Sequence, residues 1–233
     1  MGCAMALYDT IFKRRSVRSF SKAPVNDDLI AEIKKHIEEI EQLNGYRTRM
    51  EILTGEQIDG SASHYVVAYC EASLGDYINV GYCMESVDLF IQGLGLGSLW
   101  LGGGRPKKIK DENYCIVMAF GNTDVPLRFG ENDFSRLSIR EISNEDNAVA
   151  RAVRLAPSAR NNQPWQLNFA DRNLVINYRG RGLLRGVFKK KLSKIDMGIA
   201  LRFAELAYIR YGEEVNHLEI IDGGNSFAVR ITH

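Results

Sequence analysis

Residues 156–165 read APSARNNQPW, and they mark a change from helix to loop to strand within ten positions. Apolar residues at helical spacing precede the loop, namely Ala148, Ala152 and Val153. Pro157 predicts that this helix ends, because the residue before a proline is pushed out of the α region. The polar side chains of the loop could contact a ligand or satisfy their own backbone: Ser158, Asn161, Asn162 and Gln163. So many special residues in so short a segment favour ligand binding.

Residues 14–18 read RRSVR and follow a predicted helix with Leu7, Ile11 and Phe12 on one face. The segment offers three guanidinium groups and one hydroxyl group. Arginine donates to phosphate oxygens in a fixed fork, and serine adds a short neutral hydrogen bond. The segment is therefore typical of a phosphate monoester site, although a solvated basic helix end would have the same composition.

Residues 93–104 read GLGLGSLWLGGG, where a predicted helix ends and a strand begins. A glycine-terminated helix would explain Gly95 or Gly97, but not the triple glycine after Leu101. Missing side chains let a ligand approach backbone N–H groups closely. The spacing does not match the dinucleotide-binding pattern, in which GxGxxG follows a strand and opens a helix.

The chain contains an internal repeat. Residues 12–22, FKRRSVRSFSK, align with residues 134–144, FSRLSIREISN, and residues 79–81 align with residues 196–198. A loop-like segment at residues 122–133 separates the two copies. We therefore expect two related halves, residues 1–125 and residues 126–233.

Hydrophobic periodicity predicts an α+β fold in which helices outnumber strands. Asn26 is expected to cap a helix, and Ser143 with Asp146 resembles a capping box for another. Long helices are expected from about residue 75 and over residues 195–211. The expected strands are residues 64–70, 114–120, 165–169, 174–178, 217–221 and 227–232.

The composition excludes several classes of function. The 233 residues include 30 Lys plus Arg and 29 Asp plus Glu, so no overall field would attract nucleic acid or an anionic membrane. The N-terminal residues do not predict a secretory leader, and the apolar runs are too short to predict a membrane span. The four scattered cysteines, Cys3, Cys70, Cys83 and Cys115, do not predict a metal site. A cytoplasmic location is the simplest expectation.

Together, RRSVR, the glycine-rich strand and APSARNNQPW resemble the FMN-dependent nitroreductase family over nearly the whole chain. The resemblance implies a nitroreductase-like fold with FMN at an interface that relatives form between two chains. It implies that Arg14, Ser16 and Arg18 hold the phosphate and ribityl end of FMN, with Arg15 nearby. The backbone at Leu101, Gly102 and Gly103 would face the reactive edge of the flavin. The second unit would contribute Pro157, Ser158, Ala159 and Asn161.

The sequence departs from this family because neither half carries all three motifs. The first half has KKHIEEIEQL, residues 34–43, where the second has the APSARNNQPW segment. The second half has VNHLEII, residues 215–221, in place of the glycine-rich strand. We therefore expect one composite site, one FMN per chain, and a monomer that contains a pseudo-dimer. RLSIR, residues 136–140, would be a vestige or a structural remnant, and Arg128 is a possible additional phosphate ligand.

The expected function is an FMN-dependent oxidoreductase that passes electrons from NADH or NADPH to a small acceptor such as a nitroaromatic or a quinone. The flavin would carry the chemistry, so no catalytic side chain is named. The alternative is a module that stores, senses or delivers flavin without nicotinamide turnover.

Overall fold

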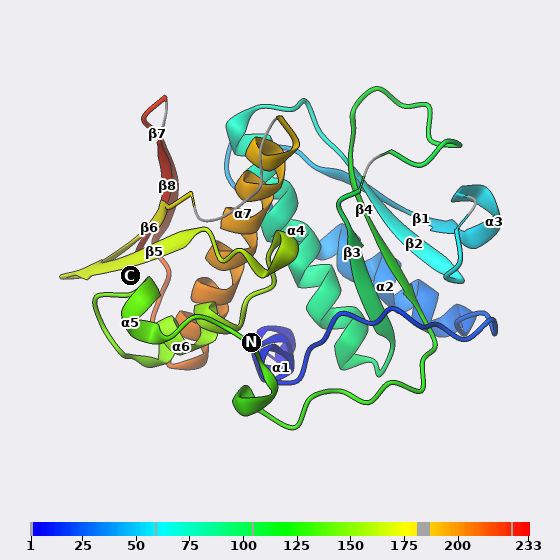
Figure 1. The fold of residues 1–233 in the computed structure, drawn as a ribbon, viewed down its shortest axis with the longest axis horizontal. Helices are drawn as coiled ribbons and strands as arrows, with labels where there is room; N and C mark the ends of the chain where they lie inside the picture. Colours follow the sequence, from blue (N-terminus) through cyan, green and yellow to red (C-terminus); the bar gives the residue numbers. More distant parts are fainter. Residues whose placement is uncertain (1, 59, 104, 181–186, 225) are drawn as a thin grey trace.

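The computed structural model describes residues 2–58, 60–103, 105–180, 187–224 and 226–233. Two four-stranded antiparallel sheets stand at opposite sides of a central layer of helices (Figure 1). The long helices α4 and α7 cross in this layer, and one continuous apolar core joins them to both sheets. The α+β class expected from the sequence is therefore confirmed.

The first half contains four helices and one sheet. Its elements are α1 (Gly2–Ile11), α2 (Asp27–Glu39), β1 (Arg49–Thr54), α3 (Gly55–Ile58), β2 (His64–Tyr69), α4 (Leu74–Gly93), β3 (Gly97–Leu101) and β4 (Tyr114–Gly121). Asn26 caps α2 as predicted, since its side chain accepts a hydrogen bond from the Asp28 N–H at 2.7 Å. A capping box formed by Ser73 and Asp76 begins α4.

The second half repeats this arrangement with shorter leading helices. Its elements are η1 (Glu131–Asp133), α5 (Ile139–Ile142), α6 (Ala148–Leu155), η2 (Ala159–Asn161), β5 (Trp165–Ala170), β6 (Asn173–Tyr178), α7 (Val187–Arg210), β7 (His217–Asp222) and β8 (Phe227–Thr232). The predicted capping box of Ser143 and Asp146 is wrong. Asn147 caps α6 by accepting from the Ala150 N–H at 2.9 Å, while Asp146 pairs with Arg151.

The two sheets have the same strand order and the same connections. The first runs β1-β2-β4-β3, and the second runs β5-β6-β8-β7. In each sheet the long helix, α4 or α7, connects the second strand to the third along the chain. This matching topology agrees with the internal repeat in the sequence.

The helices α4 and α7 approach each other closely at two glycines that the repeat aligns. A Cβ atom on Gly81 would lie 2.0 Å from the carbonyl oxygen of Ile195. A Cβ atom on Gly198 would lie 1.9 Å from the carbonyl oxygen of Ile78. The contact is reciprocal, as in a two-fold symmetric interface, and only glycine leaves room for it.

The thiols of Cys70, Cys83 and Cys115 are free and buried, whereas the Cys3 side chain lies outside the described residues. No group of three or more His, Cys, Asp or Glu side chains that could hold a metal ion occurs among the described residues. In the same part of the chain, no helix combines the length and apolar character needed to cross a membrane.

Candidate functional site

A cavity of about 770 Å³ opens between the two halves. Most of the residues predicted to bind the cofactor line it: Arg14, Ser16, Arg18, Gly102, Gly103, Pro157, Ser158, Ala159 and Asn161. Two do not. The Arg15 guanidinium donates to the carbonyl oxygen of Pro126 at 2.8 Å, and Leu101 lines an adjoining pocket of about 220 Å³. Gly104 lies outside the described residues.

Extended backbone and a buried acidic group hold the RRSVR segment beside β3. The Val17 N–H donates to the carbonyl oxygen of Ser98 at 2.8 Å. Arg14 is only 2% exposed, and its Nε donates to Asp88 on α4 at 3.1 Å. Arg14 is therefore not part of a solvated helix end, because it is fixed in the interior at the wall of the cavity.

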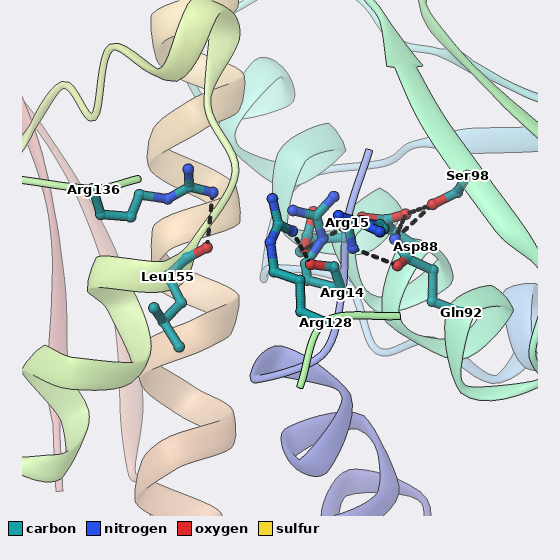
Figure 2. Close-up of polar contacts among 9 residues, drawn as sticks. Arg14, Arg15, Asp88, Gln92, Ser98, Arg128, Arg136 and Leu155 are labelled. Atoms are coloured by element: carbon teal, nitrogen blue, oxygen red, sulfur yellow. Dashed lines mark hydrogen bonds and ion pairs between the residues drawn. The ribbon is translucent and has the colours of Figure 1, made fainter. Parts of the chain in front are cut away.

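Several donors satisfy the buried Asp88 carboxylate (Figure 2). The Ser98 hydroxyl and the Gln92 amide donate to it, and the Gln92 side-chain oxygen accepts from the Arg15 N–H at 2.8 Å. Next to this group, burial and then the Asp88 charge raise the pKa of Glu85 well above its usual value, while Arg14 opposes the shift. Two buried acidic residues, Asp88 and Glu85, thus lie behind Arg14, which begins an arginine-lined part of the cavity that we call the cationic wall.

Arg128 and Arg136 complete that wall, and Arg136 reaches it from the opposite side to Arg14 (Figure 2). The guanidinium carbons of Arg128 and Arg136 lie 4.2 Å and 5.5 Å from the ring centroid of the buried Phe134. Burial, followed by the charges of Arg14, Arg128 and Arg154, lowers the pKa of Arg136 to about 10. The Nε atom of Arg136 is buried and has no hydrogen-bond partner among the described residues.

The segment around η2 uses some of its polar groups to hold its own shape. Arg160, Asn161 and Gln163 have positive φ angles of 53°, 57° and 45°. Ser158 Oγ accepts from the Gln163 N–H at 2.8 Å. Asn161 accepts from Arg136 Nη1 at 2.6 Å. Ser158 and Asn161 thus support the backbone or neighbouring residues, as one interpretation of the loop expected, and they also line the cavity, so ligand binding by the loop stays a prediction.

Asp196 lies on α7 at the wall of the cavity and is 3% exposed. Its Oδ1 accepts from the Ala159 N–H at 2.9 Å, whereas its Oδ2 is buried without a hydrogen-bond partner in the described part of the chain. Burial raises the pKa of Asp196 to about 8, opposed by the bond from Ala159.

Apolar side chains form another part of the cavity wall, namely Leu99, Ile116, Leu192, Ile195 and Ile199. The cavity therefore combines a cationic region with an apolar region that contains a single buried acid. Such a site suits a ligand with a flat apolar body and an anionic group.

The sequence did not assign Arg136, Trp100 or Asp196 to the site, although all three line the cavity. RLSIR was interpreted as a remnant, yet its Arg136 shares the cavity with Arg14, the residue with which the repeat aligns it. Arg140, the other arginine of that segment, is exposed. The alignment of RLSIR with RRSVR was the available signal for Arg136.

Comparisons with known proteins place this geometry in a family. A family model described as "Putative TM nitroreductase" matches residues 6–208. The solved structure of a protein described as a putative nitroreductase from Thermotoga maritima MSB8 superposes with a TM-score of 0.70 at 20% identity, covering 97% of this chain and 93% of that one.

Two further solved structures match part of this chain. A nitroreductase-like family protein from Bacillus cereus has a TM-score of 0.47 at 20% identity, covering 58% of this chain and 92% of its own. A protein described as a putative nitroreductase in complex with FMN, from Desulfovibrio desulfuricans, has a TM-score of 0.48 at 18% identity, covering 60% and 96%. No curated protein matches the sequence. From the family match over residues 6–208, this chain belongs to the nitroreductase family of oxidoreductases.

Proposed function

We propose that the protein binds one FMN in the cavity between its halves and passes electrons from NADH or NADPH to a small acceptor such as a nitroaromatic or a quinone. The observation that carries this proposal is the division of one 770 Å³ cavity into a cationic region and an apolar region. FMN has the same division between its phosphate and its ring.

The cationic region fits a phosphate dianion. Arg14, Arg18, Arg128 and Arg136 line it. Burial, followed by the charge of Arg14, lowers the pKa of both Arg128 and Arg136. Like charges held this close in a partly buried site are destabilising until an anion neutralises them. The partnerless Nε of Arg136 is a further donor of this group. These side chains would hold the phosphate through charge-assisted hydrogen bonds.

The apolar region fits the ring. Leu99 and Ile116 from the first sheet face the same cavity as Ile195 and Ile199 from α7, so side chains from both halves would enclose the ring. Bound flavin would supply reversible acceptance of electrons, and the protein would orient it and exclude water from it. Arg14 would be held in place for the phosphate by Asp88, its partner at 3.1 Å.

We also propose that the two halves are copies of one unit, now fused in a monomer. The identical strand orders and the reciprocal contacts of Gly81 and Gly198 support this proposal. The interface that a two-chain relative would form between subunits then lies inside this chain.

Anaerobic titration tests the function. The purified protein is incubated with FMN, and unbound FMN is removed. The protein should then show the visible absorbance of bound flavin, and NADH or NADPH should bleach this absorbance. Reoxidation by a quinone or a nitroaromatic should restore the colour. A protein that binds FMN but is bleached only by dithionite would instead be a flavin store or carrier. A protein that binds no FMN would refute the proposal altogether.

A further inference from the structure

Oδ2 of Asp196 is a buried polar atom that the described residues leave without a hydrogen bond. The side chain is 3% exposed at the wall of the cavity. Oδ1 accepts a hydrogen bond from the Ala159 N–H at 2.9 Å, and Oδ2 has no hydrogen-bond partner among the described residues. Buried polar atoms are nearly always paired, so an exception at a cavity wall points to a ligand.

The equivalent position in the first half holds a side chain whose polar atoms are all paired. The repeat aligns Asn79 on α4 with Asp196 on α7, and Asn79 is fully buried. Its Oδ1 accepts from the Leu43 N–H at 2.9 Å, matching the bond from Ala159 to Asp196. Its Nδ2 donates to Gln42 at 3.0 Å and to Thr48 at 2.9 Å. Asn79 is thus saturated by the protein, and Asp196 is not.

The protonation state of Asp196 decides what its free oxygen can offer. Burial raises the pKa of this carboxyl to about 8. The elements around it carry Arg160 on η2, Glu85 on α4, Cys115 on β4 and Lys191 on α7, and none of these groups contributes to the shift. Burial therefore favours the neutral, protonated form of the Asp196 carboxyl group. Because Oδ1 accepts from Ala159, the proton belongs on Oδ2, which becomes a donor.

We propose that Asp196 binds the flavin as a neutral acid, with Oδ2–H donating a hydrogen bond to an acceptor atom of the ring and Oδ1 holding the Ala159 loop. This inference rests on the proposed function, because it needs the ring in the apolar region. A carboxylic acid kept neutral by an apolar site is an established way for a protein to donate such a bond. Asp196 would then fix the ring and the covering loop through one side chain.

The test is the affinity for FMN and for riboflavin measured by fluorescence quenching between pH 7 and pH 9.5. This window lies above the second pKa of a phosphate, about 6, so the phosphate charge hardly changes. For the wild-type protein, both dissociation constants should rise as Asp196 ionises, approaching about tenfold per pH unit above its pKa. Asp196→Asn should be flat within about twofold, since its amide offers the same acceptor and donor as the neutral acid.

Two further variants complete the experiment. Asp196→Leu should bind both flavins at least about tenfold more weakly at every pH, because a buried ring acceptor would be left unpaired. Asp222→Asn is the matched control, since Asp222 also accepts from a backbone N–H, that of Gly224 at 2.9 Å, but is exposed. It should follow the wild-type pH profile.

A wild-type affinity that does not change with pH would overturn the inference, as would an Asp196→Asn variant that binds as weakly as Asp196→Leu. If Asp196→Leu does not fold, the wild-type and Asp196→Asn profiles decide alone. Absence of FMN binding by the wild-type protein at every pH refutes the proposed function instead.

Discussion

Replacing Gly198 by alanine should separate the two long helices. The added Cβ atom would lie 1.9 Å from the Ile78 carbonyl oxygen and 2.8 Å from the Tyr82 nitrogen. These are backbone atoms, which cannot rotate away as a side chain can. Ordinary contact begins near 3.4 Å, so α7 must move by about 1.5 Å. Overpacking of a buried contact costs ~1–3 kcal/mol, and a clash with backbone belongs at the upper end.

Thermal unfolding of the variant measures this effect. For a chain of this size, a loss of about 3 kcal/mol lowers the Tm by roughly 6–12 °C. Gly81→Ala should cost a similar amount, because its Cβ atom would lie 2.0 Å from the Ile195 carbonyl oxygen. Gly130→Ala is the control. No atom lies within 4 Å of a Cβ added to Gly130, and its φ of 170° is extended.

FMN affinity should fall in Gly198→Ala as well, because Ile195 and Asp196 on the displaced helix line the cavity. A Tm within about 1 °C of wild type for Gly198→Ala would show that the close approach of the helices is incorrect.

Other predictions concern the cationic wall and the assembly. Arg136→Ala should weaken FMN binding by about 1.5–3 kcal/mol and riboflavin binding much less. The control Arg140→Ala, at an exposed position, should change neither affinity. Equal losses of affinity for both flavins would place Arg136 away from the phosphate. Arg14→Ala should destabilise the fold by roughly 3–5 kcal/mol in urea unfolding, because it removes the guanidinium charge that pairs with the buried Asp88 carboxylate, and an unchanged midpoint would contradict the pairing. Sedimentation at micromolar concentration should find a monomer, and titration of the apoprotein should find one FMN per chain; a dimer that shares FMN, or two equal sites, would be incompatible with a composite site.

Much of the fold could be predicted because the long elements carry strong local signals. The cap at Asn26, the strand starting at His64 and the proline that ends α6 all depend on residues close in sequence. The strand β1 was missed, because RMEILT alternates between polar and apolar residues over only its first four positions and becomes a strand through its pairing with β2. The first two turns of α7, from Val187, were also missed.

The site likewise combines residues that the sequence predicts with residues that only contacts between distant segments bring together. Most residues of the three motifs could be predicted to gather, because the resemblance to a family implied that the motifs share one site. For Arg136 the sequence offered only the alignment of RLSIR with RRSVR, and for Asp196 it offered no signal, because the role of both residues depends on where the second half places them. Arg136 reaches the cavity beside Phe134 and Asn161, and Asp196 reaches it because α7 packs against α4 and η2. These are contacts between segments distant in sequence.

The segment at residues 122–133 has a consequence for how the site is assembled. It joins the two halves covalently, and the Arg128 N–H donates to the carbonyl oxygen of Lys13 at 2.8 Å, which ties the segment back to the first half. The encounter between the two walls of the cavity is therefore intramolecular, with an effective concentration set by this short connection. Dilution of the protein cannot separate the two walls. The formation of the cavity therefore depends on the folding of one chain and not on the protein concentration.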